Sequence, residues 1–171
     1  MCKQNFAKHV LSWNEIDYCI LLLRDALRDR QFDEIVGISR AGLVASVLLA
    51  HALDMRSMSV LELQITNDDT INAKKFDEVK VVRLPCPTRI QGRRILLADD
   101  IVGSGRTMAK AQELLINQLG AAHLTRCSLV VNEANLSVPL DTVCDFVGVR
   151  VKGWTVFPWE YKKNTNGLAD A

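Results

Sequence analysis

The sequence of 171 residues lacks the features that mark several large classes of protein. Its 21 Lys and Arg residues against 20 Asp and Glu leave a net charge of only +1 at pH 7. A nucleic-acid or anionic membrane surface usually shows a clear basic excess. The longest apolar stretch, 43–53, is interrupted by Ser46 and His51 and is too short to span a bilayer. We therefore expect no membrane partner, little nucleic-acid binding and, with no internal repeat or linker, one domain.

Cysteine is scarce and shows no pairing pattern. The five cysteines are odd in number, scattered, and without a CxxC pair. This pattern excludes the usual disulfide framework and zinc site, and favours reduced thiols. The first ten residues contain Lys3, Lys8 and His9 and do not read as a secretory signal. A cytoplasmic protein is expected.

Aromatic residues make up only 6% of the chain, yet they gather in the segment 152–161, KGWTVFPWEY. The remaining composition, 49% hydrophobic and 24% charged, is that of an ordinary soluble domain. Clustered tryptophans often serve only to pack an end of the fold, and this is the preferred interpretation for Trp159. Trp154 follows an expected strand and a glycine, which favours a role in covering a planar ligand.

The most informative stretch is RRILLADDIVGSGRTMAKAQELL, at 93–115. Four apolar residues at 95–98 are typical of a strand buried on both faces, and Met108 begins a helical pattern. The turn between them carries Gly103 and Gly105, which let the backbone approach a ligand closely. Free backbone amides and the helix dipole favour an anion at such a turn, and Ser104 and Thr107 add hydroxyl donors.

Asp99 and Asp100 directly follow the apolar run, at the edge where open α/β sheets bind ligands. They are placed to accept hydrogen bonds from a sugar diol or to hold Mg²⁺ through water. The turn matches neither GxGxxG nor GxxxxGK[ST], so the common dinucleotide and P-loop motifs do not apply. The alternative interpretation is an ordinary strand-to-helix turn without a ligand.

A second anion site is indicated upstream. The strand expected at 34–39 is followed by the turn Ser39-Arg40-Ala41-Gly42 and a helix through residue 53. An arginine at a helix start grips phosphate oxygens with a fork of donors. A capped helix with a surface arginine would read the same way if this turn stood alone.

Other elements frame these two turns. Ser12 and Glu15 form a capping box before an amphipathic helix with Ile16, Ile20, Leu23 and Leu27 on one stripe, ending near Arg30. Further strands are expected at 57–65, 79–84, 124–131 and 144–151, and Gly120 is typical of a helix C-cap.

Three motifs together resemble one family. The string DDIVGSGRT after ILLA resembles the 5-phosphoribosyl-1-diphosphate (PRPP) motif of the type I phosphoribosyltransferases. The turn at 39–42 resembles the family's pyrophosphate loop, where the peptide equivalent to Ser39–Arg40 is often cis. The segment DFVGVRVKGWTVFPWEY is similar to the hood of the 6-oxopurine transferases, particularly the W-x-x-x-P-W-[DE] run of the xanthine-guanine type. The motifs follow the family's order over nearly the whole chain.

The resemblance implies an α/β fold with a twisted, mostly parallel five-stranded sheet and helices on both faces. It implies a single domain over 1–171, with a small hood from about 1–13 and 150–171. The polar stretch within about 64–80 lies where the family has a mobile lid, although the Ser-Tyr pair of several purine members is absent. A long hairpin remains the alternative for that stretch.

The implied activity is a pentosyl glycosyltransferase of nucleotide salvage. It would move the 5-phosphoribosyl group from PRPP to a nucleobase, here a purine, and release diphosphate and a nucleoside 5'-monophosphate with Mg²⁺ as cofactor. The expected partners are PRPP, diphosphate, the base and further copies of the chain in a dimer or tetramer. The resemblance assigns catalytic roles to Asp99, Asp100 and Arg40, and water-mediated Mg²⁺ binding to the two aspartates. It assigns base binding to Trp154 and Thr155, and PRPP binding to Ser39, Arg40, Ala41, Gly42, Asp99, Asp100, Ile101, Val102, Gly103, Ser104, Gly105, Arg106 and Thr107.

Two departures leave the base open. The 6-oxopurine enzymes usually carry an aspartate where this chain has Gly103, and a lysine near Val131 or Asn132. Arg106 before Thr107 is similar to the GRT of uracil-type and pyrimidine-operon regulatory members, which keeps a pyrimidine acceptor as an alternative.

A protein of another class remains a second hypothesis. Some proteins of this fold bind PRPP or nucleotides to sense them, with weak turnover or none. Arg89, Arg93 and Arg94 form a small basic cluster that such a regulator would turn toward nucleic-acid phosphates. The low net charge disfavours this hypothesis.

Overall fold

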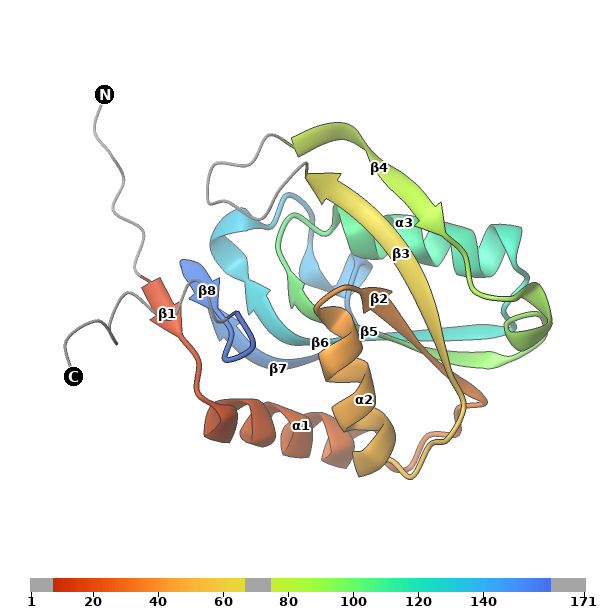
Figure 1. Cartoon of the computed structure of the whole chain (residues 1–171), viewed down its shortest axis with the longest axis horizontal. Coiled ribbons are helices and arrows are strands. Elements are labelled where there is room, and N and C mark those ends of the chain that lie inside the picture. The colour runs from red at the N-terminus through yellow and green to blue at the C-terminus, as the bar shows by residue number, and fades with distance from the viewer. Residues whose placement is uncertain (1–7, 67–74, 161–171) are drawn as a thin grey trace.

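The structure is a computed structural model, and it describes residues 8–66 and 75–160 (Figure 1). The helices are α1 (Trp13–Leu27), α2 (Gly42–Ala52) and α3 (Arg106–Glu113), the last continued by a π-helical turn, η2 (Leu114–Gln118). Short 3₁₀ turns are η1 (Pro87–Arg89), η3 (Glu133–Asn135) and η4 (Leu140–Thr142). The strands are β1 (Lys8–Val10), β2 (Glu34–Ser39), β3 (Met58–Thr66), β4 (Lys75–Arg83), β5 (Arg94–Val102), β6 (His123–Asn132), β7 (Phe146–Val151) and β8 (Trp154–Val156).

The main sheet has the strand order β4-β3-β2-β5-β6-β7, and every neighbouring pair except β3–β4 is parallel. From β2 the chain moves outward to β3, and from β5 it moves the other way to β6 and β7. The order therefore reverses between β2 and β5. In open α/β sheets ligands bind at the carboxyl edge of such a switch point.

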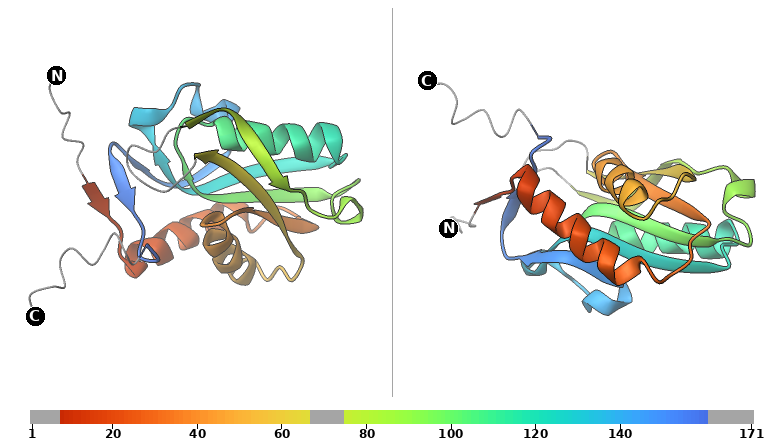
Figure 2. Two further views of the ribbon diagram at one scale, coloured as in Figure 1. Left: turned by 45° about the horizontal axis from the view of Figure 1, so that its top comes forward. Right: turned by 90° about the horizontal axis from the view of Figure 1, so that it is seen from below.

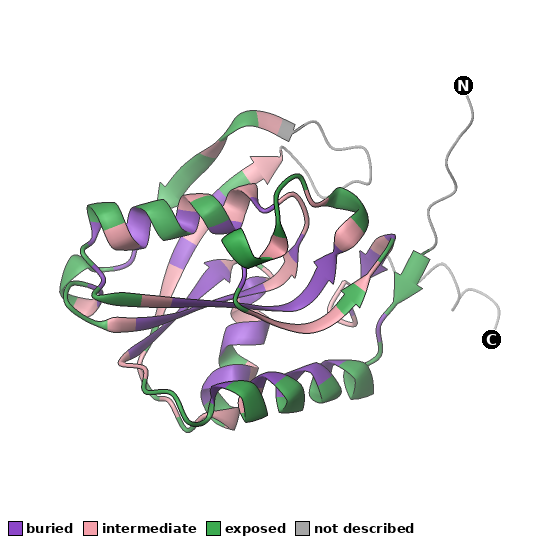
Figure 3. Cartoon of the chain, turned by 180° about the vertical axis from the view of Figure 1, so that it is seen from behind, coloured by how far each residue is buried: buried purple, intermediate pink, exposed green. Residues whose placement is uncertain are grey.

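Apolar residues of β5 show why the sheet is buried on both faces. Ile95 and Leu97 belong to the core under α3 and η2, whereas Leu96 and Ala98 belong to the core under α1 and α2. Because alternate residues of a strand face opposite sides, an unbroken apolar run fills both cores at once. Figure 2 shows α1 and α2 over one face of the sheet and α3 over the other, and Figure 3 shows the buried central strands.

Helix α1 forms as its sequence predicts. The backbone N–H of Ser12 donates to Glu15 Oε2 at 2.7 Å, and the backbone N–H of Glu15 donates to Ser12 Oγ at 3.3 Å. The expected stripe of Ile16, Ile20, Leu23 and Leu27 is buried. The helix ends at Leu27, one turn before the predicted Arg30, and Arg30 lies instead over the Phe146 ring at 4.7 Å.

The predicted α/β architecture is confirmed, but the sheet has six strands rather than five. The edge strand β4 runs antiparallel to β3, a pairing that needs no crossover helix. Its β-strand pattern is weak because most of its described side chains are exposed. Residues 67–74, at the centre of the predicted lid, lie outside the described residues, so the lid stays a prediction.

A small parallel sheet joins the two ends of the described chain. Strand β1 pairs with β8, with Lys8 opposite Trp154 and Val10 opposite Val156. This pairing lies within the ranges for which a hood was predicted, while residues 1–7 and 161–171 lie outside the described part. Over the described residues, no helix has the length and apolar character needed to cross a membrane.

Candidate active site

The β2–α2 turn and the β5–α3 turn leave the sheet side by side at the switch point. The ladder between β2 and β5 ends at the pair Gly37–Ala98, so Ser39 and Asp100 stand just beyond it. The aspartates lie within β5 rather than after it, because pairing with β6 continues to Val102. Asp99 and Asp100 are thus held by β6 on one side and open to the β2–α2 turn on the other.

Helix α2 packs directly on the first aspartate. A Cβ added to Gly42 would stand 2.6 Å from Asp99 Oδ1 and 3.0 Å from Asp99 Cα. Any side chain at this position would push the helix away from β5, so glycine is required for the close approach. The peptide between Ser39 and Arg40 is cis, as predicted. The predicted phosphate turn and the predicted ribose carboxylates are therefore in direct contact.

Burial sets the protonation of the two aspartates. Asp99 is only 8% exposed, and burial, followed by the charge of Asp100, raises its pKa well above the ordinary range. Burial is also the largest cause raising the pKa of Asp100 to about 6, against hydrogen bonds that lower it, and Glu160 adds a charge that raises it. Two carboxylates in a low-dielectric site repel each other, so a cation or a donating diol between them relieves the cost.

Both helices at this edge begin without a side-chain cap. In the described chain, neither Ala41 at the N-cap of α2 nor Gly105 at the N-cap of α3 caps its helix with a side chain. In α2 the amides of Leu43 and Val44 already donate to the carbonyls of Arg40 and Ala41, at 3.1 and 3.0 Å, so an anion there would meet the amides of the 39–42 turn. The first turn of α3 presents its own amides to an anion. Gly105 has φ +83° and a Cβ there would stand 3.1 Å from Val143, which fixes this position as glycine.

Gly103 differs from Gly105, the other glycine of this turn, in the space around it. A Cβ built at Gly103 meets no heavy atom within 4 Å, so the turn has room for a side chain that the sequence does not supply. The neighbouring Ser104 is oriented through its carbonyl, which accepts a hydrogen bond from Ser137 Oγ at 2.8 Å.

Arg106 lies differently from what the motif predicts. Its guanidinium donates to the backbone carbonyls of Phe76, at 3.1 Å, and Asp77. The side chain therefore tethers the beginning of α3 to the beginning of β4. A phosphate role for Arg106 rests on its backbone amide, which is the first of α3. This tether could not be predicted from the sequence, because its partners are backbone carbonyls, which every residue type carries.

The aromatic segment contains residues that pack together and residues whose predicted role is to bind the base. Trp159 stacks on Phe157 with ring centroids 4.6 Å apart and contacts Trp13 at 5.9 Å, which confirms the packing role predicted for Trp159. Trp154 is half-buried on β8, whereas Thr155 is 93% buried with a hydroxyl oxygen that finds no hydrogen-bond partner among the described residues. The base-binding roles of Trp154 and Thr155 stay predictions.

Comparison with known proteins decides the family. The model of the phosphoribosyl transferase domain matches residues 12–165. This chain belongs to the phosphoribosyltransferase family. The match covers both turns, β5 and the aromatic segment.

The chain is also similar to individual proteins and to a solved structure. Xanthine-guanine phosphoribosyltransferase of Roseobacter denitrificans is 26% identical over 156 residues, which cover 88% of this chain and 84% of that protein. The bifunctional protein PyrR of Bacillus mycoides is 28% identical over 122 residues, which cover 68% of this chain and 66% of that protein. The crystal structure of a purine phosphoribosyltransferase from Pyrococcus horikoshii matches with a TM-score of 0.73 at 27% identity, covering 90% of this chain and 93% of that one.

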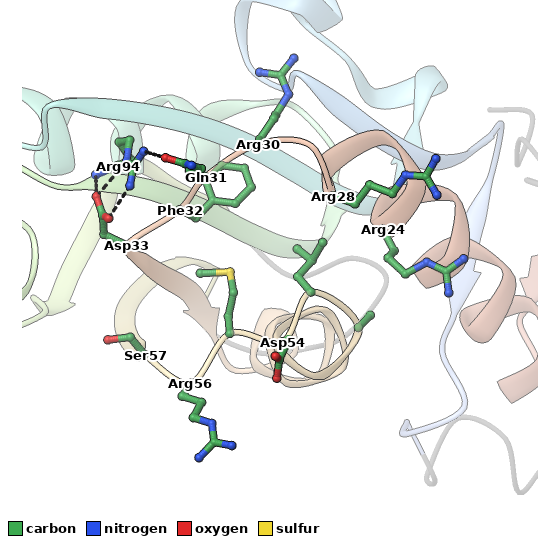
Figure 4. Close-up of a pocket in the computed structure, with 13 residues that line it drawn as sticks. Arg24, Arg28, Arg30, Gln31, Phe32, Asp33, Asp54, Arg56, Ser57 and Arg94 are labelled. Carbon is green, nitrogen blue, oxygen red and sulfur yellow. Dashed lines mark hydrogen bonds and ion pairs between the residues drawn. The ribbon is translucent and has the colours of Figure 1, made fainter.

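One cavity of this phosphoribosyltransferase, lined by described residues, lies away from the two turns. About 630 Å³ in volume, it lies at the opposite edge of the sheet, before β2 and β3, and is rimmed by arginines (Figure 4). Arg94 is committed there to a bidentate pair with Asp33 and a bond to Gln31 at 2.6 Å. In Figure 4 the heads of Arg28 and Arg56 point away from the cavity. Asp33 and Gln31 therefore engage the guanidinium of Arg94, which leaves it less hydrogen-bonding capacity for an anion.

The same pairing weakens the basic cluster that a nucleic-acid regulator would use. Arg89 forms a bidentate pair with Glu34, which is fully buried, at 3.0–3.1 Å, and Arg94 pairs with Asp33. Two of the three predicted arginines thus hold the sheet together at its amino edge.

Proposed function

We propose that this protein transfers the 5-phosphoribosyl group from PRPP to a purine base, giving a nucleoside 5'-monophosphate and diphosphate. The observation that carries the proposal is the contact between Gly42 and Asp99, which sets two uncapped helix N-termini on either side of a carboxylate pair. PRPP has a diphosphate at one end, a monophosphate at the other and a ribose diol between them. Its chemistry matches that arrangement group by group.

Each turn has a stated task in this proposal. The 39–42 turn binds the diphosphate through its amides and the guanidinium of Arg40. The amides of 103–107, with the hydroxyls of Ser104 and Thr107, bind the 5'-phosphate. Asp99 and Asp100 accept hydrogen bonds from the ribose hydroxyls, and the indole of Trp154 covers the base.

In the reaction the bond from ribose C1 to the diphosphate oxygen breaks, and its electron pair leaves with diphosphate. A bond from a base nitrogen to C1 forms, and the proton of that nitrogen is released. Positive charge builds on the sugar in between, next to Asp99 and Asp100, whose negative charge stabilises it. The remaining task of the protein is to align base and leaving group.

The carboxylate pair also fits Mg²⁺. Within the described residues, no group of three His, Cys, Asp or Glu side chains could hold a metal ion. Two carboxylates alone suit Mg²⁺, which keeps several waters and is shared with substrate phosphates. Asp99 and Asp100 would hold the ion, and it would neutralise the charge of the departing diphosphate.

The purine class is supported by the relatives named for xanthine-guanine and purine substrates. A pyrimidine acceptor remains the alternative that Arg106-Thr107 keeps open. The bare turn at Gly103 favours a second candidate, a PRPP or nucleotide sensor with weak turnover, because no side chain stands there to take the proton of the base. A cytoplasmic location and a dimer or tetramer are further expectations.

The proposal is tested by diphosphate release from PRPP and Mg²⁺ with a panel of purine and pyrimidine bases. A transferase releases diphosphate only when its base is present, and the preferred base names the class. A sensor binds PRPP in the same buffer and releases none with any base, which would refute the transferase.

Arg40→Ala tests the pyrophosphate loop on its own. We expect it to weaken binding of PRPP and of diphosphate by about tenfold or more, because each loses charge-assisted hydrogen bonds. Binding of the nucleoside monophosphate product, which leaves this loop empty, should change little. Calorimetric titration of the three ligands measures this, and an equal loss for all three would place Arg40 elsewhere.

A further inference from the structure

The base-reading lysine of the 6-oxopurine enzymes would fall near Val131 or Asn132, where this chain has no lysine. Of these two residues, Asn132 is the one with a polar side chain. It is the last residue of β6, pairs with Val151 of β7, and is only 5% exposed. Its amide nitrogen donates to the carbonyl of Gly153 at 2.7 Å. Its amide oxygen accepts from the backbone N–H of Gly153 at 3.4 Å and from that of Ala134 at 3.2 Å. Both ends of the carboxamide are therefore engaged by backbone.

Gly153 is the residue through which the chain turns from β7 into β8. It has φ +149°, a conformation that side-chain-bearing residues rarely adopt, and it is buried. Glycine adopts this conformation without strain, so the hydrogen bonds made by its N–H and C=O are what can hold it there. The carboxamide of Asn132 binds both backbone groups of Gly153, the N–H on one side of its Cα and the C=O on the other, and Trp154 follows immediately.

We propose that Asn132 is a positioning residue that fixes the Gly153 peptide and thereby sets the indole of Trp154 over the base. This inference rests on the proposed function. It also has a consequence for base specificity. The Asn132 side chain holds the β7–β8 connection and does not contact the 6-substituent of the base.

The chemistry of the alternative residue supports this division of labour. A lysine has three donors and no acceptor. At position 132 it would leave the N–H of Gly153, a buried residue, without its acceptor, and an unmade hydrogen bond is costly in a buried site. The base would thus be recognised by stacking and shape, and 6-oxo and 6-amino purines would be distinguished weakly.

The test compares Asn132→Ala with Asn132→Asp and with the control Asn135→Ala, whose side chain is exposed in the adjacent turn η3. In the protein without ligands, hydrogen exchange at Gly153 and Trp154 should become about tenfold faster in Asn132→Ala. It should rise less in Asn132→Asp, which keeps the acceptor, and not at all in the control. We call the two hydrogen bonds between Asn132 and Gly153 the Asn132 clamp. Unchanged hydrogen exchange in Asn132→Ala would overturn it.

A double-mutant cycle then separates positioning from direct contact. Asn132→Ala should raise the KM for the base about tenfold, equally for 6-oxo and 6-amino purines, with little change in the KM for PRPP. In a Trp154→Ala background the same change should add almost nothing, because its effect passes through the indole. Full additivity, or a loss confined to one 6-substituent, would show that Asn132 contacts the base and would overturn the inference.

Hydrogen exchange tests the role of Asn132 and diphosphate release tests the transferase activity, so each can fail without the other. If no base supports diphosphate release, the transferase proposal fails by itself, while the clamp still stands or falls on the exchange data. If turnover is normal and exchange at Gly153 is indifferent to Asn132, the clamp fails and the transferase stands.

Discussion

At position 103 a glycine stands where related 6-oxopurine enzymes carry an aspartate, and the space around it is open. The turn is otherwise that of the family, so the missing carboxylate is a local change rather than a different site. General acid–base groups contribute about 10²–10⁴-fold to a rate where the chemistry needs one. Turnover on a 6-oxopurine is therefore expected to be slow in this protein.

Gly103→Asp tests that expectation directly. Because a Cβ at 103 meets nothing within 4 Å, the variant should fold normally. It should raise kcat for hypoxanthine or guanine by about tenfold or more, since a proton acceptor is restored. Gly103→Asn, of the same shape without the basicity, is the control. Equal kcat values for Gly103→Asp and Gly103→Asn would show that proton transfer to residue 103 does not cause the increase.

Trp154 is the residue on which the predicted base site depends. Stacking on an aromatic side chain is worth about 1–3 kcal/mol per base in single-stranded nucleic-acid complexes, and a free base gains from the same contact. Trp154→Ala should raise the KM for the base by about one to two orders of magnitude and leave the KM for PRPP nearly unchanged. Trp154→Phe should recover most of the loss. Steady-state kinetics with unchanged base KM in Trp154→Ala would make this indole a packing residue.

Among the elements, β5, α1 and the second half of β4 could be read from the sequence, whereas the first half of β4 and the contacts of β6 could not. An unbroken apolar run and a capping box are local signals, because the residues that form them are adjacent in the chain. The tether of Arg106 to β4 and the clamp of Asn132 on Gly153 join residues 21 or more positions apart through backbone groups. Backbone partners leave no residue-type pattern, so neither contact was predictable.

The loop before β2 is tied to β5 by the pair Asp33–Arg94, which offers a test at this scale. Side-chain hydrogen bonds from Arg94, and then its backbone hydrogen bond, lower the pKa of Asp33 to about 2. A lowered folded-state pKa stabilises the fold above the unfolded value near 4, and this contribution is lost as the pH falls toward 2.

Asp33→Asn should therefore lower the urea midpoint at pH 7, and the difference from the parent should shrink between about pH 4 and pH 2. Asp29→Asn, whose side chain is 93% exposed, is the matched control and should change little. A difference that stays constant through this range would show that the charge of Asp33 does not contribute.

In the whole molecule, the reversal of strand order between β2 and β5 places both predicted anion turns at one edge. The paired arginines and the arginine-rimmed cavity lie at the other edge. The motif order in the sequence predicted that the two turns would share one edge, because parallel strands bring their carboxyl ends together. It did not predict the sixth strand or the packing of Gly42 on Asp99.

We propose that the two turns form a single PRPP site, whichever base is used and whether or not turnover is fast. The most direct measurement is calorimetric binding of PRPP with Mg²⁺ to the parent and to the double variant Asp99→Asn/Asp100→Asn. We predict that the parent binds one PRPP per chain, and that the double variant keeps its fold by circular dichroism and loses binding. Parent-like PRPP affinity in the double variant would contradict the account.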